Sequence, residues 1–243
     1  MTENRAFHRP SEPPSEWGLA VGDRQAPNAR RAETAHEPRQ AAHAYDGSDA
    51  LDILDAGKVN TWEGGASFTL ANRAYRAAWS VVWLIFASWT PAPMHRWRRL
   101  LLLAFGAKIA RTAGVYPSAR IWSPANLEMG DYAFIGPRVI VYSMAKITFA
   151  PYSLASQGAH LCAGAHDVED VNFQLQAKPI RIGYRAWIAA EAFVGPGVVV
   201  GDGAVLGARG CAFRDLDPWR IYVGNPARPT RARKVRFPSP EAL

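Results

Sequence analysis

The sequence predicts an all-β solenoid, in which short parallel strands wind into a three-sided prism, and two observations predict it. An apolar residue recurs at every sixth position through thirteen six-residue steps, interrupted by two-residue slips at Leu127-Glu128 and Ile147-Thr148 and by one long break. The fifth residue of each step is small or β-branched. Neither the helical period of 3.6 nor strand alternation produces such a pattern. The apolar positions are Val115, Ile121, Met129, Ile135, Val141, Phe149, Ala155, Leu161, Ile182, Ile188, Val194, Val200 and Leu206.

A six-residue repeat fits a solenoid because each step supplies one short strand and one corner, and three steps close a coil. Coils then stack at about 4.8 Å, the spacing between paired strands. The first position points into the prism, and the fifth points inward near a corner where only a small side chain fits. A β-sandwich with Gly-rich turns is the alternative, but its strands would be unevenly spaced and would alternate with period two.

Before the repeat, the composition changes. From Met1 to about Asp49 the chain mixes Pro, Glu, Arg, Ala and Ser with few large apolar residues, and such a stretch cannot bury enough surface to offset its ordering entropy. We expect residues 1–65 to be a disordered or irregular tail. No early apolar core has basic flanks, so a cleaved secretory signal is not expected.

Residues 66–112 are expected to be helical. Eighteen uncharged residues separate Arg76 from His95, and no Asp or Glu occurs between Gly64 and Leu127. This length approaches that of a membrane span, but Pro91 and Pro93 shorten the usable helix. Two interpretations remain open: a helix lying on an anionic membrane surface, with a second helix near 94–105, or a helical cap packed on the first coil.

Charge and cysteine content limit the remaining choices. The net charge of +7 is concentrated in the helical segment and in a basic tail at 227–243, after a repeat domain placed at 113–226. Cys162 and Cys211 are the only cysteines, which gives neither a disulfide framework nor zinc-ligand spacing. A reducing cytoplasm is the simplest setting.

Several segments resemble one known family. FGAKIARTAGVYPSARIWSPANLEMGDYAFIG, SQGAHLCAGAHD, AWIAAEAFVGPGVVVGDGAVLGARG and VGNPARPTRARK are similar to the hexapeptide-repeat acyltransferases, and most similar to the WcaF-type colanic-acid acetyltransferases. The resemblance covers about 67–234. It implies a left-handed parallel β-helix, acetyl-CoA as co-substrate without a metal, a homotrimer with the acyl site between adjacent solenoids, and a sugar hydroxyl on an exopolysaccharide or its lipid-linked precursor as acceptor.

His166 is the expected general base. The thioester of acetyl-CoA is already activated, whereas an acceptor alcohol must lose a proton as it attacks, and a neutral imidazole suits that task near pH 7. His166 ends a six-residue step where the repeat breaks into the excursion 167–181, and loops on rigid scaffolds often carry function. In the resembled family the His of the segment matching Gly164-Ala165-His166-Asp167 is catalytic.

Other candidates for a catalytic role are weaker. His160 lies at an outward sixth position, where a surface or packing role is expected. Cys162 stands at a corner normally filled by a small residue, and nothing around it in sequence favours a thiolate nucleophile; the same holds for Cys211.

The resemblance also implies binding residues. Small outward residues would let the pantetheine arm of CoA pass, and basic residues would bind its phosphates; these are Ala190, Ala208, Arg214, Arg228 and Arg231. The chain has Ala212-Phe213-Arg214-Asp215 where family members often have a run such as Val-Thr-Lys-Asp. For acceptor contacts we expect Tyr142, Ser143 and Asp167, on segments that should flank His166.

Three rival functions remain. A metal-dependent β-helix enzyme of the γ-carbonic-anhydrase type needs three His ligands, and the repeat domain has only His160 and His166. A nucleic-acid-binding module would rest on the basic patches alone, without a recognisable motif. Acetylation of a small molecule or another non-polysaccharide acceptor is the third. The expected location is the cytoplasm, peripheral at the inner face of the membrane if the apolar helix binds lipid.

Overall fold

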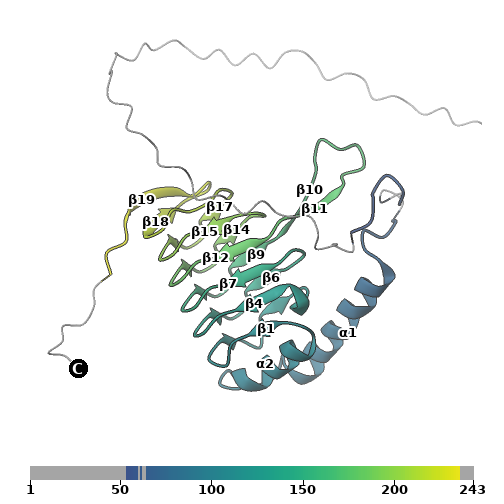
Figure 1. Cartoon of the computed structure of the whole chain (residues 1–243), viewed down its shortest axis with the longest axis horizontal. Coiled ribbons are helices and arrows are strands. Elements are labelled where there is room, and N and C mark those ends of the chain that lie inside the picture. The colour runs from purple at the N-terminus through teal and green to yellow at the C-terminus, as the bar shows by residue number, and fades with distance from the viewer. Residues whose placement is uncertain (1–52, 60, 62–63, 236–243) are drawn as a thin grey trace, which may run out of the picture. The chain divides into compact units, whose positions relative to one another are not determined.

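A computed structural model describes residues 53–59, 61 and 64–235, which all belong to one compact unit within Tyr45–Leu243. Parallel coils stack along one axis, and two helices lie at the end where the first coil begins (Figure 1). The tail predicted over 1–65 lies outside the described residues, apart from 53–59, 61, 64 and 65.

Two helices precede the coils. Helix α1 (Leu70–Phe86) begins after Thr69, whose side chain accepts a hydrogen bond from the Asn72 N–H, as N-cap residues do. Its buried face meets the first coil: Trp79 Nε1 donates to the Ile121 carbonyl at 2.7 Å. Helix α2 (His95–Ala104) packs on strands β1 (Lys108–Ile109) and β2 (Gly114–Val115). The cap on the first coil, one of the two expected interpretations, is therefore present.

Arg98 of α2 is fully buried, and no carboxylate of the described residues forms an ion pair with it. Its guanidinium donates to the carbonyls of Val115 at 2.7 Å and Pro91 at 2.9 Å, and to Thr90 Oγ1 at 2.8 Å. Desolvation lowers the pKa of Arg98 from its ordinary value. Arg98 thus ties the turn between the helices to the first coil and adds nothing to the surface charge.

Three parallel sheets form the faces of the prism. The first contains β1 (Lys108–Ile109), β4 (Leu127–Met129), β7 (Ile147–Phe149), β12 (Ile180–Ile182) and β15 (Val199–Val200). The second contains β2 (Gly114–Val115), β5 (Phe134–Ile135), β8 (Leu154–Ala155), β13 (Trp187–Ile188), β16 (Val205–Leu206) and β18 (Arg220–Val223), with β19 (Arg228–Ala232) antiparallel at its edge. The third contains β3 (Arg120–Ile121), β6 (Ile140–Tyr142), β9 (His160–Cys162), β14 (Phe193–Val194) and β17 (Cys211–Ala212).

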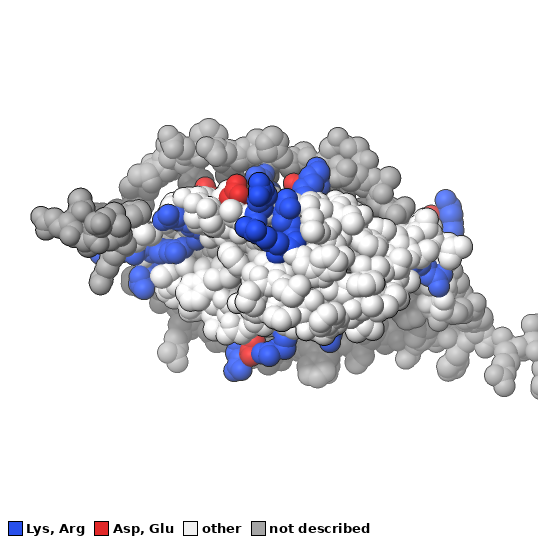
Figure 2. Space-filling model, turned by 90° about the horizontal axis from the view of Figure 1, so that it is seen from below, with Lys and Arg blue, Asp and Glu red and all other residues white. Residues whose placement is uncertain are grey.

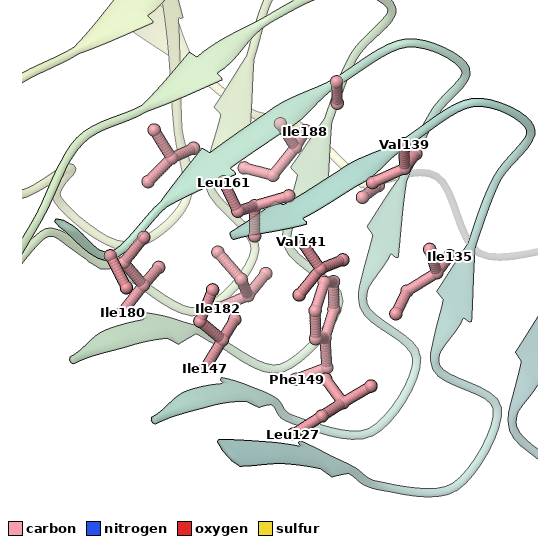
Figure 3. Close-up of a cluster of buried hydrophobic side chains, with 14 of the residues drawn as sticks. Leu127, Ile135, Val139, Val141, Ile147, Phe149, Leu161, Ile180, Ile182 and Ile188 are labelled. Atoms are coloured by element: carbon pink, nitrogen blue, oxygen red, sulfur yellow. The ribbon is translucent and has the colours of Figure 1, made fainter. Parts of the chain in front are cut away.

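The six-residue repeat accounts for the core. All thirteen first-position residues are buried, and Figure 3 shows several of them converging inside the prism. The strands that contain the two slips pair with each other in register, because Leu127 pairs with Ile147 and Met129 pairs with Phe149 in the first sheet. Each slip therefore adds a second inward residue to a longer strand, and the same pattern recurs at Ile180 and Ile182.

The solenoid is longer than the repeat predicted. Its first strand begins at Lys108 rather than at 113, and β18 and β19 continue the second sheet through the boundary placed at 226. The fifth positions are buried as expected except Ala125 and Ala165. Ala125 lies in a short 3₁₀ helix (Pro124–Asn126), and Ala165 lies in a hairpin that leaves the coil.

This hairpin is the long break in the repeat. It consists of β10 (Gly164–His166) and β11 (Leu175–Ala177), which pair antiparallel. The excursion therefore starts at Gly164, three residues earlier than the sequence suggested, and it places His166 on a strand of the hairpin. Among the described residues, no helix is long and apolar enough to cross a bilayer.

Candidate active site

The hairpin fixes the orientation of the His166 ring. His166 pairs with Leu175 across the two strands, and its Nδ1 lies 2.7 Å from the carbonyl oxygen of Phe173. A carbonyl oxygen only accepts, so Nδ1 carries the proton and donates it. In the neutral ring the lone pair is then on Nε2, on the opposite side. This is the arrangement that a general base needs, with one nitrogen anchored and the other ready to accept a proton.

The residue that supplies this carbonyl has an uncommon backbone. Phe173 has φ of +50°, in the left-handed region that non-glycine residues rarely occupy. Such conformations persist where the surroundings hold them, and seven other non-glycine residues of the described chain, among them Tyr132 and Arg185, also have a positive φ. Here the conformation occurs in the residue whose carbonyl oxygen binds His166 Nδ1.

Asp167 stabilises the hairpin from within. Its Oδ1 accepts from the Glu169 N–H at 3.1 Å, and its Oδ2 accepts from Gln176 Nε2 at 3.0 Å. Its own N–H donates to the Gln174 carbonyl at 2.9 Å. The structure thus gives Asp167, predicted as an acceptor contact, a role in shaping the hairpin that carries His166.

A pocket of about 460 Å³ opens beside His166. Its walls come from the hairpin and from the segment before α1, and they are mainly apolar. The lining residues are Leu54, Ala56, Thr61, Gly65, Ser67, His166, Phe173 and Leu175.

Sequence reasoning missed the wall contributed by residues 54–67. Gln174 of the hairpin binds it, because its Oε1 accepts from the Ala56 N–H at 2.7 Å and its Nε2 donates to the Leu54 carbonyl at 3.3 Å. Ile53 also forms an antiparallel bridge with Phe68, so this segment folds back on the start of α1. The apolar pair Ile53-Leu54 is a local signal for this wall, but it falls within the tail predicted over 1–65.

Tyr142, a predicted acceptor contact, lies beneath the base of the hairpin. Its carbonyl accepts from the Ala163 N–H at 3.1 Å, and its half-buried ring packs against Trp122. A Cβ built on Gly164 would lie 3.3 Å from the Tyr142 ring and 2.2 Å from Met144 Sδ. A larger residue at position 164 would therefore require the Met144 side chain to move from the place where the hairpin leaves the coil. Burial raises the pKa of Tyr142 above its usual value.

The structure corrects the prediction for Ser143. Its side chain is fully buried, and its hydroxyl donates to the Ser123 carbonyl at 2.8 Å while accepting from the Ser123 N–H at 3.0 Å. The hydroxyl therefore both donates and accepts a hydrogen bond between two neighbouring coils. Ser143 stabilises the stack and is not accessible to an acceptor.

The predicted CoA-binding residues lie away from this pocket. Ala190 and Ala208 occupy equivalent corners of successive coils, joined by a hydrogen bond of 2.9 Å from the Arg209 N–H to the Ala190 carbonyl. Arg214 follows β17, and Arg228 and Arg231 lie exposed on β19. None of the five lines the pocket beside His166 within one chain.

His160 is held as a packing residue. It is half-buried in β9, and its ring meets the Phe193 ring edge to face at 5.4 Å between centroids. Burial lowers the pKa of His160 below its ordinary value, which favours the neutral ring. Within the described ranges, no group of three or more His, Cys, Asp or Glu side chains is placed to hold a metal ion.

No family model matches the chain. WcaF of Escherichia coli K12, provisionally named a colanic acid biosynthesis acetyltransferase, is 43% identical over 155 residues, covering 64% of this chain and 85% of WcaF.

Two solved structures share the fold. A galactoside acetyltransferase in complex with coenzyme A superposes with a TM-score of 0.62 at 20% identity, covering 74% of this chain and 91% of that one. A hexapeptide-repeat acetyltransferase from Vibrio cholerae O1 biovar eltor, in complex with acetyl coenzyme A, gives 0.61 at 20% identity, covering 75% and 100%. These likenesses show the fold, and they confirm the predicted left-handed β-helix.

Proposed function

Because this chain belongs to the WcaF-type hexapeptide-repeat acetyltransferases, we propose that it moves an acetyl group from acetyl-CoA to a sugar hydroxyl of an exopolysaccharide or another cell-surface glycan. The likeness in fold to acetyltransferases crystallised with acetyl coenzyme A and with coenzyme A supports acetyl-CoA as the donor. The name of WcaF supports a glycan as the acceptor.

The proposed step is a direct transfer assisted by His166. As the acceptor oxygen attacks the thioester carbonyl carbon, Nε2 takes the hydroxyl proton, and the carbonyl oxygen becomes an oxyanion. When the tetrahedral intermediate collapses, the C–S bond breaks, and the imidazolium returns its proton to the leaving CoA thiolate. A thiol with a pKa near 8.5 leaves readily, so one imidazole serves both transfers.

The observation that carries this proposal is the bond of 2.7 Å from His166 Nδ1 to the Phe173 carbonyl. It supports a proton on Nδ1 and a free lone pair on Nε2, and the ring lines an open pocket. Removing the bond or the imidazole would remove the oriented base.

We propose a homotrimer in which Ala190, Ala208, Arg214, Arg228 and Arg231 bind CoA in the cleft between adjacent solenoids, since none of them lines the pocket of its own chain. Tyr142 and Asp167 remain proposed acceptor contacts. We also propose a cytoplasmic location.

The test is a transfer assay with acetyl-CoA and a panel of simple glycosides, oligosaccharides and non-sugar alcohols. It would follow release of the CoA thiol together with the mass of the acetylated acceptor. We expect acetylation of glycosides, and we expect His166→Ala to lower turnover by about 10²-fold or more. His160→Phe is the matched control and should retain most activity. Near-normal turnover by His166→Ala would refute the assignment of the base, and acetylation of only the non-sugar alcohols would refute the glycan acceptor.

A further inference from the structure

The two helices carry an exposed apolar face on the side away from the coils. On α1 the residues opposite Trp79 are exposed: Leu84 is 68% accessible, and Trp89, just beyond the helix, is 72% accessible. On α2, Leu100 is 55% accessible. We define the helix face as Leu70, Val81, Leu84, Ile85, Phe86, Trp89, Met94, Trp97 and Leu100, which are all exposed large hydrophobic residues.

This face is continuous across the turn between the helices. Trp97 Nε1 donates to the Phe86 carbonyl at 2.7 Å, which places the Trp97 side chain against the end of α1. Trp89 Nε1 donates back to the Ile85 carbonyl at 2.6 Å, so its polar atom is satisfied while its ring remains exposed. An apolar patch of this kind on a folded domain indicates a contact with another surface.

The charges around the helix face favour an anionic partner. Residues 64–127 contain no Asp or Glu, and the exposed cations of the helices include Arg73 on α1 and Arg96 on α2. Figure 2, seen from below, shows a broad uncharged surface with several groups of Lys and Arg, some of them beside an Asp or Glu. Arg98 contributes nothing to this charge because it is buried.

We propose that the helix face docks on the surface of a bilayer that contains anionic lipid, with α1 and α2 lying in the headgroup region. Tryptophan and long aliphatic side chains with basic neighbours are what an in-plane helix uses there. Each basic side chain near an anionic surface adds attraction that salt weakens. A second copy of the chain is the competing occupant, but it would bring the same basic residues together.

The docking would place the active site close to the lipid surface. Ser67 and Gly65, which line the pocket beside His166, lie just before α1 begins. A sugar attached to a membrane lipid would then reach the pocket without leaving the bilayer. This last step rests on the proposed function, whereas the docking itself does not.

The experiment is co-sedimentation of the full chain with vesicles of phosphatidylcholine containing phosphatidylglycerol, and with vesicles of phosphatidylcholine alone. We expect binding to the anionic vesicles that falls as salt rises. The double variant Leu84→Glu/Trp89→Glu should lower partitioning by about tenfold or more, and Arg96→Gln by about fivefold. Val223→Glu, an exposed apolar residue on β18 at the other end of the solenoid, is the matched control and should bind like the wild type.

Equal sedimentation with both vesicle types, or unchanged binding by the double variant, would overturn the proposal. Light scattering of the same proteins tests the competing occupant. If the double variant formed a smaller assembly and the wild type bound no vesicles, the helix face would be an interface with a second copy of the chain. That result would also overturn the docking proposal. Transfer to a soluble glycoside by the double variant separates the two proposals. Retained transfer with lost vesicle binding supports docking, whereas a wild type that binds vesicles but transfers to no glycoside would sink only the proposed function.

Discussion

The regular coils and the hairpin at 164–177 are built on different principles. In the coils each inward side chain is stacked between equivalent residues of the coils on either side, as Leu161 is between Val141 and Val194. The hairpin has no such repetition. It is held by specific hydrogen bonds, among them those of Asp167 and Gln174, and it carries the candidate base. Stability therefore depends mainly on the coils, and activity mainly on the break in them.

Truncation inside the coils is expected to give the largest effect on stability. Leu161→Ala should lower the free energy of unfolding by about 2–5 kcal/mol, because it leaves a cavity in a fully buried stack. Val171→Ala, at an 82% exposed position in the hairpin, should change it by less than about 0.5 kcal/mol. Denaturant unfolding at one fixed protein concentration measures both. Equal losses of unfolding free energy in the two variants would contradict the view that stability depends mainly on the coils.

A change in the hairpin should act on the pocket instead. Gln174→Ala removes the acceptor of the Ala56 N–H and the donor to the Leu54 carbonyl, at a cost of about 1–3 kcal/mol to the local fold. We expect faster hydrogen exchange at Ala56 and about a tenfold fall in kcat/KM.

The matched control for that change is Gln176→Ala, two residues along the same hairpin, whose side chain binds Asp167 instead of the segment at 54–56. Its Ala56 amide should exchange at the wild-type rate. If both variants exchanged alike at Ala56, Gln174 would not be the link between the hairpin and this segment.

The smallest expected effect is a pH dependence that originates in the coils. Burial lowers the pKa of His160 in the folded protein, so the unfolded chain binds the proton more readily. Stability should therefore be complete above the unfolded value of about 6.5 and should fall as the pH drops below it. His160→Phe should weaken this fall in thermal unfolding measured between pH 8 and pH 5. A variant with an undiminished fall would show that other groups, such as His95, cause it, since burial lowers the pKa of that ring too.

The same division explains what the sequence could predict. The coils could be predicted because every inward side chain must be apolar to pack against the equivalent side chains of the neighbouring coils. Even the strands at the two slips, which begin at Leu127 and Ile147, pair in register. His166 was found because it stands at the end of the repeat. The lining residues Leu54 and Ser67 were missed, because contacts more than a hundred residues apart, such as that of Ala56 with Gln174, leave no local periodicity. Ser143 was misjudged because its hydroxyl is used between coils, a contact that no single step reveals.

The proposed catalysis depends on His166 presenting Nε2 as a proton acceptor. The most direct measurement is the ¹⁵N chemical shift of both ring nitrogens of His166 in the labelled protein, assigned by comparison with His166→Ala. We predict a protonated Nδ1 and an unprotonated Nε2 at neutral pH, as the bond to the Phe173 carbonyl requires. A ring protonated on Nε2, with Nδ1 bare, would contradict the account.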